Sequence, residues 1–377
     1  MNIVIYQDLV INPDEGGISK MSQTYYKYLS EKGYNVWFLS MNVGSRKLHS
    51  HQLVLKGSTM EEKKRSFISI IKSLSTDVII YQNGISPYNN YILRWSKECD
   101  IKIVDVIHNT LRGMYGIGGH QKLSKIKPQI ANHFIDKLLN VFFMLKYGKY
   151  YREQFRLSDC VVLLSNKFRN EISYFTGWHD FNKFKAILNP LTIKPPQNIN
   201  RNKSKTVLHV ALFNEQKRQD LLLDIWKLVE EKRPEWKLKI VGDGKMRNQL
   251  FEKTNRLLLK HVSFLGFQSP LSYYEEASIF CLTSAYESFG LVLVESMAYG
   301  CVPMAFESFE TVTDIVNNGV DGVLVPPFEI KEYAEKLMFL MDDEDKRKEM
   351  SEKAVEKSKE FYIEKIMPQW VDLIEKL

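Results

Sequence analysis

Short runs of apolar residues alternate with longer amphipathic stretches along the chain. The runs occupy 2–6, 36–39, 77–81, 101–107, 159–164 and 184–188, and then 206–210, 238–241, 279–283, 302–305 and 322–325. Continuous apolar runs of this length are typical of buried parallel strands, whereas the stretches between them have a helical period. After the first run, for example, Met21, Tyr25 and Leu29 share one helical face. The pattern predicts an α/β protein with parallel sheets wound on both faces.

The runs form two series, and a segment rich in proline and asparagine separates them. A chain of 377 residues exceeds the size of one hydrophobic core, so roughly two domains are expected. We predict a Rossmann-like N-terminal domain over 1–190, a linker over 191–204, a second Rossmann-like domain over 205–360 and a last helix over 361–377. A ligand crevice is expected where the carboxyl ends of the strands of the two domains meet.

Cysteine usage and the start of the chain predict a cytoplasmic protein. Four cysteines, at 99, 160, 281 and 301, lie in or beside apolar segments without a metal-like or disulfide-like spacing, which favours buried free thiols. The first residues, MNIVIYQDLV, lack the basic flank and apolar core of a signal peptide. The longest apolar stretch, near 138–145, is too short to span a bilayer.

Basic residues are concentrated in the N-terminal half. Residues 1–200 contain 27 basic and 15 acidic side chains, a difference of +12, and residues 201–377 contain 25 and 30, a difference of −5. Between Arg112 and Arg169 the basic residues interleave with aromatic and aliphatic ones. Such a stretch indicates contact with an anionic membrane surface, at the inner face of the cell membrane, or capture of an anionic substrate. The alternative is a solvated helical hairpin whose apolar face is core. Nucleic acid is a poorer partner, because no binding motif accompanies the charge.

The segment ESFGLVLVE, from Glu287 to Glu295, follows the apolar run at 279–283 and leads into a helix that ends near 298–300. Amides of Phe289, Gly290 and Leu291 at the helix start would bind an anion such as a diphosphate. The two carboxylates would accept hydrogen bonds from sugar hydroxyls. The segment therefore has the features of a nucleotide-sugar site. Alternatively, both glutamates simply favour the positive end of the helix.

The motifs around this segment decide between these interpretations. Upstream are VGDG at 241–244, VSFLG at 262–266 and Tyr273-Tyr274, and downstream are ESMAYG at 295–300, Val302-Pro303, DIV at 314–316 and NGVDG at 318–322. In this order and spacing the series resembles the retaining, nucleotide-sugar-dependent glycosyltransferases of family four (group 1), which have the GT-B fold. The similarity is dense from about 209 to 327 and thinner, but continuous, through Gly16-Gly17, His108 and Asn189-Pro190.

The resemblance implies two Rossmann-like domains facing each other across a cleft, with the last helix crossing back to the first domain. It implies transfer of a sugar from a nucleotide-diphosphate sugar to an acceptor hydroxyl, with retention of configuration. The setting would be bacterial-type surface polysaccharide or lipid-linked glycan synthesis, with a glycan or lipid-linked acceptor.

The resemblance also assigns roles to individual residues. Lys217 matches the lysine that neutralises the leaving diphosphate, Glu287 would orient the donor sugar, and Glu295 would bind ribose hydroxyls. His108 would lie beside the donor sugar and the acceptor. Backbone amides at Gly16 and Gly17 would approach the donor phosphate, and the loop of Gly266, Phe267 and Gln268 would bracket the base. Taken alone, a glycine pair is more often a plain turn, and a lone histidine is usually a core residue.

The sequence departs from the family pattern at two places. Leu212 stands where most relatives have an arginine, and the glycines expected near Glu310-Thr311 are absent. The leaving group then has one cation fewer, unless Arg218 or a residue of the other domain supplies it. A non-catalytic partner subunit that binds nucleotide sugar is therefore the alternative function.

We expect no metal and no cofactor. Asp343-Glu344-Asp345 heads a helix, where acidic residues act as caps, and His49-Ser50-His51 has no supporting ligands nearby. The glycine-rich stretch 113–119 does not directly follow a strand, which fails the dinucleotide fingerprint and predicts instead a mobile acceptor loop.

Overall fold

The computed structural model describes residues 1–12, 16–44, 51–83, 89–108, 111 and 129–377. The chain divides into two compact units. Unit 1 comprises Met1–Thr192 together with Ile363–Leu377, and unit 2 comprises Ile193–Tyr362. Unit 1 is therefore built from two separate segments of the sequence.

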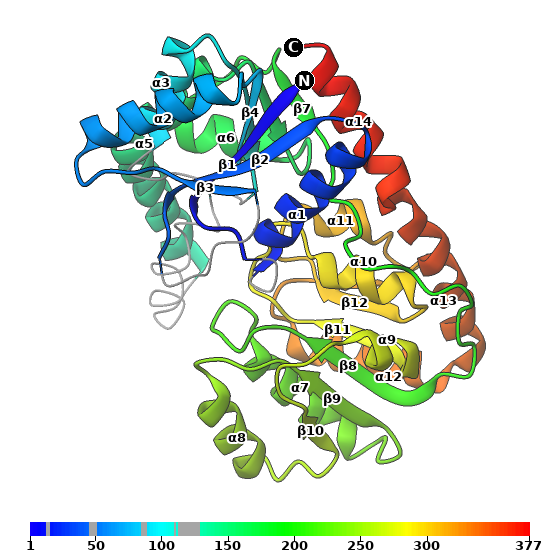
Figure 1. Cartoon of the computed structure of the whole chain (residues 1–377). Coiled ribbons are helices and arrows are strands. Elements are labelled where there is room, and N and C mark those ends of the chain that lie inside the picture. The colour runs from blue at the N-terminus through cyan, green and yellow to red at the C-terminus, as the bar shows by residue number, and fades with distance from the viewer. Residues whose placement is uncertain (13–15, 45–50, 84–88, 109–110, 112–128) are drawn as a thin grey trace. The chain divides into compact units, whose positions relative to one another are not determined.

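Unit 1 contains a seven-stranded parallel sheet (Figure 1). Its strands are β1 (Asn2–Leu9), β2 (Asn35–Asn42), β3 (Gln52–Val54), β4 (Val78–Tyr81), β5 (Lys102–Ile107), β6 (Cys160–Leu163) and β7 (Phe184–Ala186). The order is β3-β2-β1-β4-β5-β6-β7, so the winding direction reverses between β1 and β4. In open sheets of this kind, ligands bind beyond the carboxyl ends of the strands at the reversal.

The helices of unit 1 are α1 (Gly16–Glu31), α2 (Met60–Ser73), α3 (Asn89–Glu98), α5 (Gln129–Leu157), α6 (Phe168–Thr176) and α14 (Ile363–Glu375). On α1, Met21, Tyr25 and Leu29 are buried, as the spacing predicts. The last helix, α14, belongs to this unit, as the resemblance implied, and Figure 1 draws it beside α1. Trp370 of α14 is buried, and its ring centroid lies 4.5 Å from that of Tyr25.

Unit 2 contains a six-stranded parallel sheet in the order β10-β9-β8-β11-β12-β13. The strands are β8 (Ser204–Val210), β9 (Lys237–Val241), β10 (Val262–Phe264), β11 (Ala277–Leu282), β12 (Val302–Phe306) and β13 (Val323–Val325). The winding reverses here between β8 and β11, which repeats the plan of unit 1. Both sheets confirm the predicted doubly wound α/β class.

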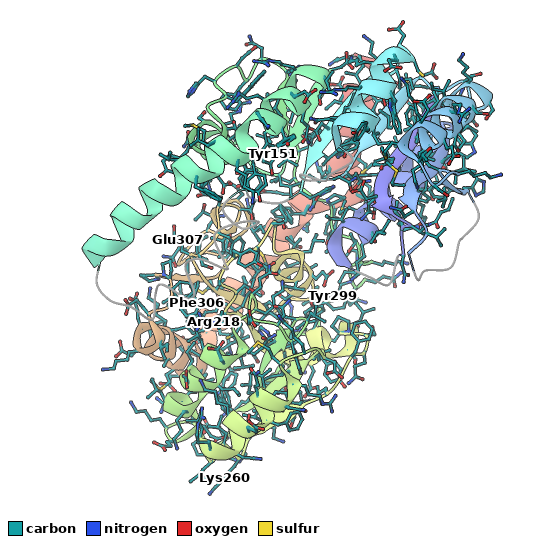
Figure 2. All side chains as sticks on the ribbon, turned by 90° about the vertical axis from the view of Figure 1, so that its left-hand side faces the viewer. Tyr151, Arg218, Lys260, Tyr299, Phe306 and Glu307 are labelled. Carbon is teal, nitrogen blue, oxygen red and sulfur yellow. The ribbon has the colours of Figure 1, made fainter. Side chains whose placement is uncertain are left out.

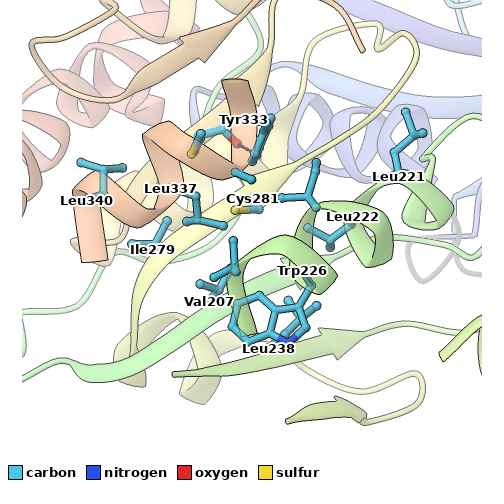
Figure 3. Packing of buried hydrophobic residues seen from close by; sticks show 14 of the residues in the cluster. Val207, Leu221, Leu222, Trp226, Leu238, Ile279, Cys281, Tyr333, Leu337 and Leu340 are labelled. Carbon is cyan, nitrogen blue, oxygen red and sulfur yellow. Dashed lines mark hydrogen bonds between the residues drawn. The ribbon is translucent and has the colours of Figure 1, made fainter. Parts of the chain in front are cut away.

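The helices of unit 2 are α7 (Gln219–Glu230), α8 (Arg247–Arg256), α9 (Leu271–Glu276), α10 (Leu291–Ala298), α11 (Val312–Ile315), α12 (Ile330–Asp342) and α13 (Glu344–Ser358), followed by the short 3₁₀ helix η1 (Lys359–Phe361). One core cluster joins α7 and α12 to the sheet, with Trp226 of α7 packed near Leu238 of β9 (Figure 3). Tyr333 of α12 enters the same cluster and donates a hydrogen bond to the Met304 carbonyl at 2.8 Å. Aliphatic and aromatic packing thus fixes the strand ends that carry the loops described below.

Several sequence predictions can be compared directly with this fold. All four cysteines are free thiols; Cys160, Cys281 and Cys301 are buried and Cys99 is half-buried. Asp343 caps α13 by accepting a hydrogen bond from the Lys346 amide at 2.8 Å, as expected for an acidic helix start. The short strands β3 and β10 were not predicted, because their residues are half-buried or exposed.

Other predictions concern, in whole or in part, residues that the structure does not describe. Arg112 and the glycine-rich stretch 113–119 lie outside the described residues, as do His49 and Ser50. Among the residues described, no helix has the length and apolar character needed to cross a membrane. Within the same residues, no group of three or more histidine, cysteine, aspartate or glutamate side chains is arranged to hold a metal ion.

Candidate active site

The loops after β8 and β11 meet at the point where the sheet of unit 2 reverses. The Ala285 amide donates to the Gln216 carbonyl at 2.7 Å, and the Gln216 side-chain amide donates to the Tyr286 carbonyl at 3.0 Å. Thr283 Oγ1 lies 3.1 Å from each of the carbonyls of Lys217 and Arg218. These bonds fix one loop against the other, because each loop satisfies the polar backbone groups of its neighbour.

This junction brings Lys217 and Glu287 into direct contact. Lys217 Nζ donates to Glu287 Oε1 at 2.5 Å, and Ser284 Oγ donates to the same oxygen at 2.7 Å. The Lys217 and Glu287 side chains are only 19% and 9% exposed. The sequence assigned these two residues to different parts of the substrate. The structure shows that each is the charge partner of the other.

The start of α10 lies directly after Glu287. Gly290 caps this helix with φ +90°, in the left-handed region, where a side chain would be strained and would crowd Phe309. Thr311 Oγ1 donates to the Phe289 carbonyl at 3.0 Å, and the Phe289 side chain is buried. The Phe289 carbonyl and side chain therefore anchor the turn. The amides that follow it begin α10 at Leu291 and give this end of the helix its partial positive charge.

Glu295 lies one turn into α10 and is 4% exposed. Its Oε2 accepts a hydrogen bond from Tyr274 Oη at 3.0 Å. Burial, and then the charge of Glu295, raise the pKa of Tyr274 well above its usual value, so the phenol remains a donor at neutral pH. Tyr274 thus orients the carboxylate that the sequence assigned to ribose.

The loop of Gly266, Phe267 and Gln268 follows β10 and is tied to the loop after β9. Gly266 has φ +75°, and its carbonyl accepts a hydrogen bond from the Gly242 amide at 2.8 Å. Gln268 Nε2 donates to the Leu265 carbonyl at 2.7 Å. The Phe267 side chain is 78% exposed. An aromatic ring in this position is available for stacking on a planar base.

Two glycines shape the loop that carries Leu212. A Cβ at Gly242 would lie 1.9 Å from the Ala211 carbonyl oxygen, and one at Gly244 would lie 2.5 Å from that of Phe213. The backbones can approach only because both positions lack a side chain. The Leu212 side chain is 58% exposed, and Gln219 Nε2 donates a hydrogen bond to the Leu212 carbonyl at 3.0 Å. The loop conformation therefore does not depend on the side chain at position 212.

Arg218, which the sequence offered as a substitute cation, is engaged within its own helix start. Its guanidinium makes two hydrogen bonds to Asp220, at 2.9 and 3.0 Å, and lies 5.7 Å from the centre of the Phe328 ring. Figure 2 labels Arg218 among the side chains of unit 2. The cation missing at Leu212 is thus not replaced by Arg218 in this structure.

Unit 1 holds the remaining predicted residues. Gly16, with φ +74°, begins α1 and is followed by Gly17 at the exposed start of the helix. His108 follows β5, is 4% exposed, and lies 3.0 Å from Gln82 Oε1 through Nε2. Burial lowers the pKa of His108 to about 4, so its imidazole is neutral at pH 7.

Sequence reasoning missed three residues that support these groups: Ser284, Tyr274 and Gln82. Ser284 and Gln82 each stand just after a buried strand, a position that commonly carries site residues, but an isolated polar residue there gave no specific signal. Tyr274 was noted as part of a motif without a role. Ser284 contacts Glu287 at a separation of 3 residues in the sequence. Tyr274 contacts Glu295 at a separation of 21, and Gln82 contacts His108 at a separation of 26.

Comparisons with known proteins agree with the motifs and the fold. Residues 192–357 match the family model described as Glycosyl transferases group 1. An uncharacterized glycosyltransferase of Haemophilus influenzae is 32% identical over 206 residues, which cover 53% of this chain and 58% of the relative. A Campylobacter jejuni α-1,4-N-acetyl-D-galactosaminyltransferase, named for a PP-undecaprenol-linked glycan, is 29% identical over 196 residues, covering 51% and 54%. The match thus spans a little over half the length of these relatives.

The fold is similar over the whole length to that of the Anabaena protein HepE in complex with UDP, with a TM-score of 0.77, 18% identity and all of both chains covered. This likeness extends over both units, beyond the region that the family model matches. Residues 192–357 therefore match the group 1 glycosyltransferase family that the motif series resembles, and the fold of both units is the GT-B fold that this resemblance implies.

Proposed function

We propose that the protein transfers a sugar from a nucleoside-diphosphate sugar to an acceptor hydroxyl. The observation that carries this proposal is the Lys217–Glu287 ion pair beside the start of α10, in which both side chains are largely buried. A cation and a helix start together suit a diphosphate, and the adjacent carboxylate suits a sugar hydroxyl. A nucleoside-diphosphate sugar presents both groups side by side.

The family resemblance supplies the individual roles, and the contacts in unit 2 support them. Lys217 and the first amides of α10 stabilise the charge that grows on the departing diphosphate. They therefore stabilise the transition state more than the ground state, which lowers the barrier. Glu295, oriented by Tyr274, accepts hydrogen bonds from the ribose. Phe267 stacks on the base.

The chemical step breaks the bond between the anomeric carbon and the diphosphate oxygen and forms one to the acceptor oxygen. The acceptor proton passes to the leaving phosphate, so no separate protein base is required. We expect a hexose donor and retention of the anomeric configuration, which the family resemblance supports. The similarity to HepE, which binds UDP, and to the Campylobacter jejuni transferase, named for a PP-undecaprenol-linked glycan, makes UDP-sugars and polyprenyl-diphosphate glycans the first donors and acceptors to assay. Synthesis of a bacterial-type surface or lipid-linked glycan is the corresponding role, with no metal or cofactor required.

Substitution of Lys217 tests this proposal. Lys217→Ala should reduce donor-dependent turnover by on the order of a hundredfold or more, because it removes a preorganised charge from the leaving group. Lys227→Ala is the matched control: this lysine also contacts a glutamate, Glu231, at 2.5 Å, but the pair is exposed on α7. Similar turnover in the two variants would remove Lys217 from the site. Proton NMR of the first product formed measures the anomeric configuration.

A non-catalytic subunit remains the second candidate function, and one observation favours it. Leu212 supplies no charge and the Arg218 guanidinium is bonded to Asp220, so neither of these two residues gives Lys217 the second cation that the family resemblance implies. Thermal-shift titration with nucleoside diphosphates, run beside a turnover assay, separates the candidates. A ligand at 100 times its dissociation constant adds about 2.7 kcal/mol of stability. Binding without turnover across a panel of donors and acceptors would favour the subunit.

We also propose that unit 1 contacts an anionic membrane surface through α5. Among its described side chains, Val141, Phe142 and Leu145 are 48%, 59% and 72% exposed. Lys146 lies over the rings of Phe142 and Tyr147, at 5.5 and 4.9 Å from their centres. From 141 to 157 the helix carries four basic residues against the single acid Glu153. Apolar side chains set among cations fit an anionic leaflet, which attracts each nearby basic residue by about 1 kcal/mol.

Vesicle sedimentation tests this contact. Lys146→Gln/Lys149→Gln should weaken binding to vesicles containing phosphatidylglycerol, and raised salt should weaken wild-type binding because the Debye length shortens to about 8 Å at physiological ionic strength. Lys348→Gln/Lys353→Gln on α13 is the control, because those lysines are exposed but paired with glutamates. If the wild type ignores anionic vesicles at low salt, α5 is an ordinary solvated helix.

A further inference from the structure

Three buried polar side chains form a hydrogen-bonded chain in unit 1. Ser22 lies on α1, Gln82 directly after β4 and His108 directly after β5. Gln82 Nε2 lies 2.9 Å from Ser22 Oγ, and Gln82 Oε1 lies 3.0 Å from His108 Nε2. The three residues are 0%, 1% and 4% exposed. These hydrogen bonds connect α1 with the carboxyl ends of β4 and β5, next to the point between β1 and β4 where the sheet reverses and a substrate is expected.

The donors and acceptors in this series of hydrogen bonds are fixed by a backbone carbonyl at one end. Ser22 Oγ lies 2.9 Å from the Ile18 carbonyl oxygen, which can only accept. The single hydroxyl proton is therefore donated to Ile18, and Ser22 Oγ accepts from the Gln82 amide nitrogen. The oxygen of the same amide then faces His108, and because it can only accept, the proton of the ring lies on Nε2. The other ring nitrogen, Nδ1, is left as an acceptor.

Burial reinforces this assignment. It lowers the pKa of His108 to about 4, and burial is the whole cause of the shift. The ring is therefore neutral throughout the physiological range, with one donor and one acceptor nitrogen. The donor is used by Gln82, so the acceptor is what the ring offers to a ligand.

We propose that Ser22 and Gln82 are positioning residues that hold His108 as the Nε2–H tautomer, so that Nδ1 accepts a hydrogen bond from a substrate hydroxyl. This inference rests on the proposed function, because the hydroxyl belongs to the sugar or to its acceptor. In this role His108 binds and orients a hydroxyl, and it does not protonate the leaving group.

The tautomer can be measured in the free protein. Long-range ¹H–¹⁵N spectra of protein labelled in histidine distinguish the two tautomers and the imidazolium, and a His108→Gln variant identifies the His108 signals. His209 is an internal control: it is also buried, but its Nδ1 lies 2.8 Å from the Cys281 carbonyl oxygen and must carry the proton. The expected spectrum therefore shows opposite tautomers for His108 and His209 at pH 7. An Nδ1–H tautomer or an imidazolium at His108 would overturn the inference.

Gln82→Glu tests the functional part. A carboxylate in place of the amide would favour the imidazolium and raise the pKa of His108, which converts Nδ1 from an acceptor into a donor. We expect kcat/KM at pH 7 to fall about tenfold, which corresponds to one lost hydrogen bond, and to recover as the pH rises through the new pKa. A merely structural role predicts a loss that is the same at every pH. Ser22→Ala should broaden or mix the His108 tautomer signals, since the amide is then free to turn.

The outcomes separate this inference from the proposed function. Normal wild-type turnover together with the Nδ1–H tautomer at His108, or with a loss in Gln82→Glu that does not vary with pH, overturns the inference alone. Absence of turnover in the wild type with every donor overturns the proposed function and the role of Nδ1 with it.

Discussion

Breaking the Lys217–Glu287 pair should destabilise unit 2 far more than the loss of an exposed ion pair does. At 2.5 Å and an effective dielectric constant of about 20, the Coulomb attraction is about 7 kcal/mol, an upper bound from which the desolvation of both groups is subtracted. Removal of one partner of a buried pair costs about 3–5 kcal/mol, because the other charge is left uncompensated. Ser284 still donates to Glu287, so we expect about 3 kcal/mol for Lys217→Met.

The double variant Lys217→Met/Glu287→Gln leaves no buried charge at this position. It should therefore be no less stable than Lys217→Met alone. The coupling energy is then at least the cost of Glu287→Gln alone, for which we expect about 2 kcal/mol because the Lys217 charge loses its partner. The control, Lys227→Met, breaks a contact of the same length whose side chains are 36% and 67% exposed, and should cost less than about 1 kcal/mol.

Native-state hydrogen exchange, read by mass spectrometry on peptides from β8 and β11, measures these changes in unit 2 without requiring the whole chain to unfold in one step. Equal losses for Lys217→Met and Lys227→Met would refute the reasoning, as would a double variant whose loss equals the sum of the single ones. Either result would mean that the pair is effectively solvated and is not a preorganised charge site.

Three further outcomes are expected. Turnover should survive EDTA, because Lys217 and the start of α10 take the place of a metal; loss of activity that magnesium or manganese restores would show that a metal supplies the cation absent at Leu212. Leu212→Arg should tighten nucleoside-diphosphate binding about tenfold in calorimetric titration without changing the loop, whose carbonyl contact to Gln219 does not involve the side chain; unchanged affinity would mean that position 212 does not face the phosphate. Burial lowers the pKa of His209 to about 4, so below about pH 6.5 the unfolded chain binds a proton that the folded chain excludes. The stability of unit 2, measured by hydrogen exchange, should therefore be full above about pH 6.5 and should decline towards pH 4 by about 1.4 kcal/mol per pH unit. His209→Gln should remove that slope.

The strands of both sheets were predictable because burial leaves a simple mark on the sequence. The run at 206–210 lies within β8, and that at 238–241 within β9, since strands covered on both faces are mostly apolar, with residues such as His209 and Lys239 as exceptions. The motif at 287–295 was readable for a related reason: a glycine at the left-handed position and a helix directly after a strand are local features. Half-buried β3 left no such mark.

The contacts between loops could not be predicted in the same way. Lys217 and Glu287 are 70 residues apart, and their pairing depends on β8 and β11 being neighbours, which only the winding order of the sheet decides. The direction of the Ser22–Gln82–His108 chain depends on which atoms lie within hydrogen-bond distance. The family resemblance suggested Lys217, Glu287 and His108, whereas their hydrogen-bond partners became known only from the structure.

The division of unit 1 into two segments has a consequence for the order of events on the ribosome. Trp370 of α14, which covers Tyr25, is made after the whole of unit 2, roughly 170 residues later than Thr192. At about 5–20 residues per second this delay is on the order of ten seconds or more. During that interval unit 2 is complete and free to fold, while Tyr25 of α1 lacks its contact with Trp370. The nascent chain should thus expose α1 to chaperones and proteases until α14 has been made, and unit 1 should close only after unit 2 has been synthesised.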